Sequence, residues 1–154
     1  MFTKEERKNI NNSFWKGLKK EMKPISNAEG KFINWLQYPT QLNHVYLRLD
    51  ATNKYATVTF DIQIKDKEIR MLVWEQLNEL KKVLEQETGN ATQWESNIMN
   101  STGQEISRIS WVKENVNLFD KTTHREMYDF YKEKLVGFDR FYQTYKEILF
   151  SLLK

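Results

Sequence analysis

The first part of the chain carries apolar residues at every fourth position, the pattern of a helix that buries one face. The stripe consists of Ile10, Phe14, Leu18 and Met22. Thr3 followed by Glu6 is typical of a capping box at a helix start, and Pro24 is placed to end the helix. The pattern therefore predicts an amphipathic helix followed by a loop at 23–31, with a short strand at 32–35.

Between residues 44 and 65 the period changes from four to two. Apolar and polar side chains alternate in the runs 44–50 and 55–65, which predicts two strands joined by a turn at 51–54. A turn centred on Thr52 and Asn53 places apolar residues opposite apolar ones on one face of the hairpin. The expected pairs are Leu49 with Ala56, Leu47 with Val58, and Val45 with Phe60, with His44 opposite Asp61 on the polar face.

A second helix and a second hairpin are expected next. The helix ends at Gly89, and the strands lie at 91–96 and 106–112 around a turn at 101–104. The stripe of that helix is Leu72, Val73, Leu77, Leu80, Val83 and Leu84.

The last segment predicts one long helix, or two helices joined near Gly137. Apolar residues recur there at steps of three or four to the end of the chain, and they extend over more than one side of the helix. Thr123 followed by Glu126 forms a second capping-box pattern at its start.

Together these elements predict an α+β fold, in which helices cover one face of an antiparallel sheet of about four to five strands. The 154 residues are expected to form a single domain, 1–154. The chain has no cysteine, and its amino-terminal residues are charged from the fourth position. We therefore expect a cytoplasmic protein without a signal peptide, a disulfide or a membrane-spanning segment.

The composition disfavours several classes of chemistry. The five glycines never lie close enough for a phosphate-binding loop or a dinucleotide fingerprint. His44 and His124 lie in different elements, so they have no metal-ligand spacing, and thiol nucleophiles are absent. The net charge of +3 is too weak and too dispersed to indicate nucleic-acid binding. We expect no cofactor and no metal centre.

The polar face of the first hairpin is one candidate binding surface. It combines Tyr46, Arg48 and Tyr55 with threonines, a composition able to stack on and hydrogen-bond a base or a peptide. A solvated sheet face has the same composition, because aromatic residues and threonine favour strands. Four lysines near the end of the first helix are a second surface, which either contacts phosphates or acidic lipids or simply faces water. They are Lys16, Lys19, Lys20 and Lys23.

A catalytic alternative rests on acidic residues beside a strand that ends in a lysine. Metal-dependent nucleases use carboxylates to hold a divalent ion and a lysine to position the nucleophile. The residues of this pattern are Asp50, Asp61, Gln63 and Lys65.

Several motifs along the chain resemble the bacterial family called domain of unknown function 4268. They are Phe14-Trp15, Ser26 to Gly30, Asn34-Trp35, Tyr38-Pro39-Thr40, Tyr46 to Ala51, Ile106 to Ile109, and Leu135 to Phe141 with Asp139. The sequence departs from the family pattern at Met127-Tyr128 and at Phe141-Tyr142, where tryptophan is usual. The resemblance implies no established chemistry. Such domains stand alone or are attached to nuclease-like domains of the restriction type, which implies a nucleic-acid or defence context.

These observations favour a non-catalytic binding or accessory module over an enzyme, with nucleic acid or another protein as its partner. The alternatives are the metal-dependent phosphodiesterase and a self-associating protein that forms a homodimer through the last helix. The candidate binding residues are Glu29, Asn34, Tyr46, Arg48, Asp50, Tyr55 and Arg108.

Overall fold

The computed structural model describes residues 1–153, which fold into four α-helices and one four-stranded antiparallel sheet. The elements are α1 (Lys4–Met22), the 3-10 helix η1 (Trp35–Gln37), β1 (Val45–Ala51), β2 (Tyr55–Ile62), α2 (Lys67–Glu79), α3 (Lys81–Thr88), β3 (Gln93–Met99), β4 (Glu105–Glu114), the 3-10 helix η2 (Lys121–Thr123) and α4 (His124–Leu152). The strand order is β1-β2-β4-β3, so β1 and β3 are the edges. This confirms the expected α+β fold and its long last helix.

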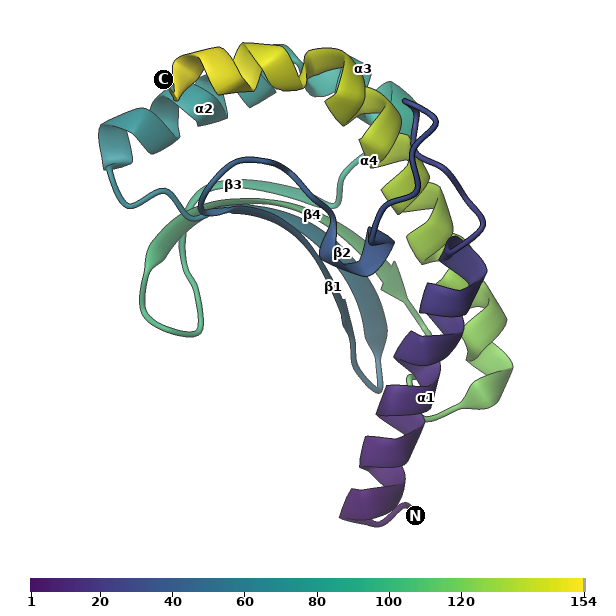
Figure 1. Cartoon of the computed structure of the whole chain (residues 1–154). Helices are drawn as coiled ribbons and strands as arrows, with labels where there is room; N and C mark the ends of the chain where they lie inside the picture. The colour runs from purple at the N-terminus through teal and green to yellow at the C-terminus, as the bar shows by residue number, and fades with distance from the viewer. Residues whose placement is uncertain (154) are drawn as a thin grey trace.

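The sheet is strongly curved, and the helices lie along its convex side (Figure 1). The convex face carries most of the apolar residues of the strands, and α4 packs across it with Phe138 against Phe60 at 4.8 Å between ring centroids. No helix among residues 1–153 covers the concave face (Figure 1). The sheet therefore has one buried face and one polar face open to solvent.

The first hairpin forms with the expected faces but with a register that differs by two residues. Val58 lies opposite Leu49 rather than Leu47, and Asp61 lies opposite Tyr46, so the expected pair of His44 with Asp61 is wrong. The turn is centred one residue later than expected, because the Thr52 hydroxyl accepts hydrogen bonds from the main-chain N–H groups of Lys54 and Tyr55. A shift of two residues keeps every side chain on its expected face.

Other boundaries also differ from the expectations. The second helix is divided at Leu80, which lets α2 pack over β3 through Trp74 on Trp94 while α3 packs along α4. Residues 32–35 form no strand: Trp35 begins η1 and its indole N–H donates to the main-chain oxygen of Ile25.

At the amino-terminal end of α4 no capping box forms. The hydroxyl of Thr123 is bonded instead to main-chain groups of Asn117 and Asp120 in the preceding loop. The capping box of Thr3 and Glu6 at the start of α1 is present as expected.

The last helix is continuous through Gly137, and its broad apolar surface is used within the chain. A Cβ atom at Gly137 would lie 2.2 Å from the main-chain oxygen of Glu87, so glycine permits close packing of α3 on α4. The side chains of Phe130 and Phe141 are buried along one side of the helix, and that of Tyr142 is buried about 100° further round. The helix packs against the sheet and the other helices. Within residues 1–153, none of the helices combines the length and the apolar character needed to cross a bilayer.

Candidate functional site

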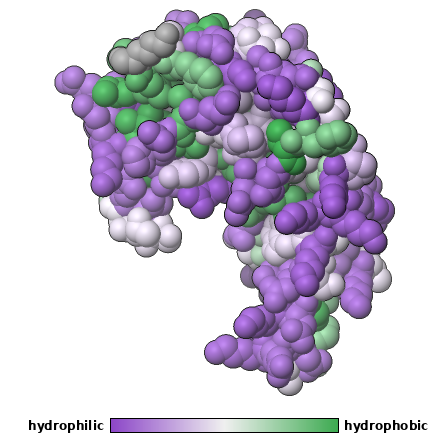
Figure 2. All heavy atoms as spheres, viewed as in Figure 1, coloured by the Kyte–Doolittle hydropathy of each residue, from purple (hydrophilic) through white to green (hydrophobic). Residues whose placement is uncertain are grey.

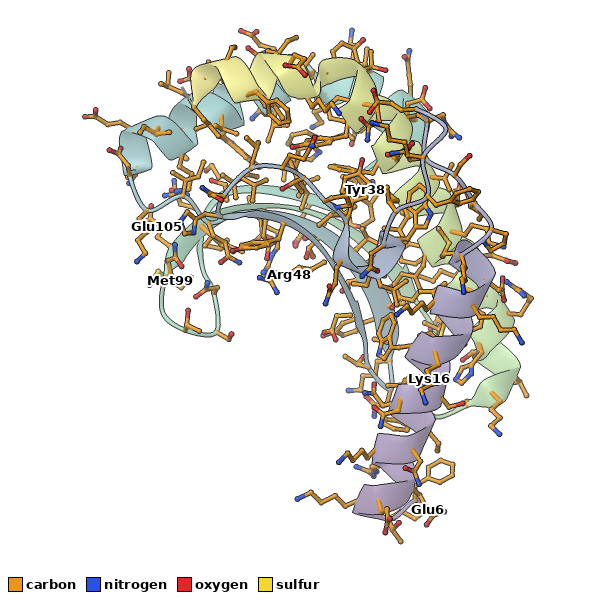
Figure 3. All side chains as sticks on the ribbon, viewed as in Figure 1. Glu6, Lys16, Tyr38, Arg48, Met99 and Glu105 are labelled. Atoms are coloured by element: carbon orange, nitrogen blue, oxygen red, sulfur yellow. The ribbon has the colours of Figure 1, made fainter. Side chains whose placement is uncertain are left out.

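The concave face of the sheet arranges its polar side chains in rows that run across the strands. The observed register places Tyr46, Asp61, Arg108 and Glu95 in one row, and Arg48, Thr59, Ser110 and Gln93 in the next. Figure 3 shows the side chain of Arg48 on this concave side of the sheet.

One arginine of this face is held by a buried partner. The guanidinium of Arg108 donates two hydrogen bonds to the carboxylate of Asp61, at 2.7 and 2.8 Å, and Asp61 is only 1% exposed. The bond to Asp61 raises the pKa of Arg108. Because Arg108 forms two hydrogen bonds with a buried carboxylate, its main role is structural: it neutralises the charge of Asp61.

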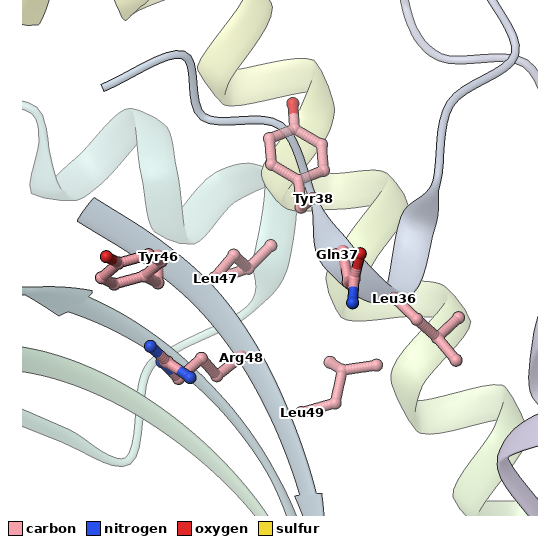
Figure 4. Close-up of a pocket in the computed structure, with 7 residues that line it drawn as sticks. All are labelled: Leu36, Gln37, Tyr38, Tyr46, Leu47, Arg48 and Leu49. Carbon is pink, nitrogen blue, oxygen red and sulfur yellow. The ribbon is translucent and has the colours of Figure 1, made fainter. Parts of the chain in front are cut away.

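The other arginine of the face lies at the mouth of a groove beside edge strand β1 (Figure 4). The groove has a volume of about 450 Å³ and lies between η1 and the strand. Its lining residues are Leu36, Gln37, Tyr38, Tyr46, Leu47, Arg48 and Leu49. We call it the β1 groove. The leucines give it an apolar wall, and the polar groups lie around them (Figure 4).

The guanidinium of Arg48 lies 4.4 Å from the centre of the Tyr46 ring, in a cation–π contact. Arg48 forms no ion pair with any residue that the structure describes. Both side chains are exposed. The site thus offers a guanidinium without an ion-pair partner, stacked on an aromatic ring.

The free edge of β1 adds main-chain hydrogen-bonding groups to the groove. Hydrogen bonds from Gln63 N–H to His44 O and from Thr52 N–H to Tyr55 O show which main-chain N–H and C=O groups of β1 point toward β2. Since the direction of these groups alternates along an antiparallel strand, those of Leu47 and Leu49 point away from β2, toward the groove. An edge strand with such groups can pair with an added extended segment.

The charge of the concave face is negative overall. Its two cations are Arg48 and Arg108, and its four acidic residues are Asp50, Asp61, Glu95 and Glu114, so the strands carry a net charge of −2 on this face. A surface of this sign does not attract the phosphate backbone of a nucleic acid.

The acidic residues of the face are also spread out. Asp61 lies opposite Tyr46, four positions from Asp50 along β1, which is about 13 Å at the usual rise per residue of a strand. Across residues 1–153, no three histidine or acidic side chains lie where they could hold a metal ion together.

A model of the family described as Domain of unknown function (DUF4268) matches residues 10–146 of the chain. The chain belongs to this family. Comparison with curated proteins and with solved structures found no match.

The structure gives a physical role to several of the motifs by which this chain resembles DUF4268. The carboxylate of Asp139 accepts hydrogen bonds from the hydroxyl of Tyr38 and the main-chain N–H of Ala28, both at 2.7 Å. Tyr142 donates to the main-chain oxygen of Thr40 at 2.6 Å. Burial and the neighbouring carboxylate raise the pKa of Tyr38. These hydrogen bonds therefore attach the segment 27–40 to α4. Because this segment contains η1, they also fix the side of the β1 groove that η1 forms, which we call the η1 wall.

The expected site residues do not form one cluster. Only Tyr46 and Arg48 line the β1 groove. Glu29 is exposed and ion-paired with Lys146 at 3.2 Å, and Asn34 lies at the start of η1. Tyr55 lies at the far end of the hairpin, beside Glu114 and away from the groove.

Asp50 is exposed on the same face as Arg48, and its main-chain oxygen accepts a hydrogen bond from Tyr131. The sequence reading missed Leu36 and Gln37, which line the groove from η1. The residues Phe32, Ile33, Asn34 and Trp35, expected to form a short strand, gave no sign that the next turn would lie beside β1.

Proposed function

We propose that this DUF4268 domain is a non-catalytic module that binds an extended segment of a partner protein in the β1 groove. The observation that carries the proposal is the guanidinium of Arg48, which has no ion-pair partner among the described residues and is stacked on Tyr46 beside free main-chain groups of an edge strand. Arginine and tyrosine are among the residues that dominate binding energy at protein interfaces. Main-chain pairing gives affinity, and the side-chain pocket gives specificity.

The groove selects the chemistry of the partner segment. An apolar side chain fits against the leucines at 36, 47 and 49, and a carboxylate nearby pairs with Arg48. The net negative charge of the concave face disfavours a nucleic acid, because each of its many phosphates would be repelled, whereas a protein segment needs only one carboxylate, placed at Arg48.

The proposed setting is the bacterial cytoplasm, in a nucleic-acid or defence context. The absence of cysteine suits a reducing compartment, and the context is the one implied by the resemblance to DUF4268. In this setting the domain acts as an accessory unit that attaches to another protein.

The proposal is tested by selecting peptides from a random library on the full chain and measuring the affinity of the best by calorimetry. We expect enriched peptides that contain an apolar residue and an acidic residue within a few positions of each other. Tyr46→Ala should weaken their binding about thirtyfold or more, the size of an interface hot spot.

Tyr55→Ala is the matched control, because Tyr55 is a tyrosine of similar exposure on the same hairpin, 40% against 37% for Tyr46, and lies outside the groove. It should leave the affinity unchanged. Equal losses for the two variants, or a library that yields no binding peptide, would contradict a peptide site in the β1 groove.

A further inference from the structure

A second groove lies between the end of α1 and the segment that precedes η1. It has a volume of about 340 Å³, and Lys19, Lys23, Asn34 and Trp35 are among its lining residues. We call it the α1 groove. Leu36 separates it from the β1 groove and lines both. Its charge is opposite to that of the concave sheet face.

The chain around this groove carries an uncompensated positive charge. From Lys8 to Lys31 it has two acidic residues, and both are engaged by cations of α4: Glu21 by Arg125 and Lys132, and Glu29 by Lys146. The lysines in the same stretch are Lys8, Lys16, Lys19, Lys20, Lys23 and Lys31. All six are exposed, and none forms an ion pair with a residue that the structure describes.

The lysines gather on one face of α1. At 3.6 residues per turn, the four lysines from Lys16 to Lys23 fall within an arc of about 100°. The opposite face of the helix is buried through Phe14, Leu18 and Met22. Figure 2 shows that residues over α1 on this side of the molecule are mostly hydrophilic, and Figure 3 labels Lys16 among them.

A highly exposed aromatic ring follows the last of these lysines in the sequence and precedes Ile33 and Asn34, which line the α1 groove. Phe32 directly follows Lys31, and 73% of its surface is exposed. The loop before it is well bonded, since the Asn27 side chain accepts from the N–H groups of Glu29 and Lys31, and Ala28 is bound to Asp139. An ordered loop thus presents a large apolar ring to solvent, where a ligand can reach it.

We propose that the α1 groove and the lysine face beside it bind single-stranded nucleic acid. The lysines contact successive phosphates, and a base stacks on Phe32. One N–H of the Asn34 amide donates to the side-chain oxygen of Gln37 at 3.4 Å, which leaves its oxygen and its other N–H for a base edge. Unpaired bases are required, because the bases of a duplex are not free to stack on a side chain. A bilayer surface suits the site less well, since membrane-binding faces present several apolar residues rather than one ring beside a hollow.

The test is fluorescence anisotropy of labelled oligo(dT) and oligo(U), each of about 20 nucleotides, titrated with the full chain at low and moderate salt. We expect binding that weakens as salt rises. The variant Lys19→Ala/Lys23→Ala should reduce the slope of log affinity against log salt by about 1.4, or 0.7 for each lost phosphate contact. Phe32→Ala should weaken binding about fivefold or more, and Phe32→Trp should preserve it.

The matched control is Lys65→Ala/Lys82→Ala, which removes two exposed lysines away from α1 and should leave the salt slope unchanged. No binding of either oligonucleotide at low salt would overturn the proposal. So would equal losses in the two double variants, or binding to anionic vesicles that is stronger than binding to the oligonucleotides. The Tyr46→Ala variant should bind the oligonucleotides normally, so this site can fail or succeed independently of the β1 groove.

Discussion

The two arginines of the concave face should respond differently to substitution, because only one of them neutralises a buried charge. Arg108→Ala removes both hydrogen bonds from the carboxylate of Asp61, which is 1% exposed and receives no other hydrogen bond from the described side chains. Arg48→Ala removes a single exposed contact with the ring of Tyr46. The first variant should destabilise the fold, and the second should mainly affect binding.

The magnitudes follow from burial. Removing one partner of a fully buried ion pair costs about 3 to 5 kcal/mol. The Arg108 side chain is 30% exposed, so water partly replaces it, and we expect a loss of about 2 to 3 kcal/mol in the free energy of unfolding. An exposed cation–π contact contributes about 0.5 to 1 kcal/mol, which sets the upper limit for Arg48→Ala.

Urea unfolding followed by tryptophan fluorescence measures both values through the midpoint and slope of the transition. The double variant Asp61→Leu/Arg108→Leu should recover much of the stability lost in Arg108→Ala, since no charge is then buried. The reasoning would be refuted if Arg108→Ala were as stable as the original protein, because Arg108 would then be free to serve as a binding residue. Equal destabilisation by Arg48→Ala would contradict it as well.

Two further predictions concern helix packing and pH. Gly137→Ala should lower the free energy of unfolding by about 1 to 3 kcal/mol in thermal or urea unfolding, because the added Cβ would meet the main-chain oxygen of Glu87. This loss should outweigh the better helix propensity of alanine. Glu147→Ala, at an exposed position of α4, is the control and should be nearly neutral. The hydrogen bond from Arg125 lowers the pKa of Glu21 below its usual 4.5, so its ionised form favours the folded state. The ionised Glu21 carboxylate adds at most about 1 kcal/mol to the free energy of unfolding. This stabilisation is complete above pH 4.5 and is lost as the pH falls through the lowered pKa. In a plot of stability against pH, Glu21→Gln should flatten that region.

The local patterns of the sequence were enough to predict the fold class and the faces of most elements. The four-residue stripe of α1 and the alternation in β1 and β2 depend only on which side of an element is buried, and these were confirmed. The register was wrong because it depends on the turn, where the Thr52 hydroxyl bonds the loop amides. Pattern alone cannot distinguish turns that keep the same faces.

The site was predictable only in part, because its residues come together through tertiary contacts. Tyr46 and Arg48 were identified from the polar face of one strand, and both line the β1 groove. Arg108 also appeared as a candidate, but its role depends on Asp61 lying opposite it on β2, which follows from the observed strand order. The η1 wall could not be anticipated, since Asp139 holds it across 101 positions of the sequence.

The most direct test of the proposed function is the change in amide NMR signals of the labelled protein when the most strongly enriched peptide is added. We predict that shifts centre on residues 36–38 and 46–49, and that amides near Tyr55 and in α1 remain unchanged. Main-chain pairing at the edge should also protect the amides of Leu47 and Leu49 from hydrogen exchange. Shifts centred on any other surface, with residues 46–49 unaffected, would contradict the assignment of the β1 groove as the binding site.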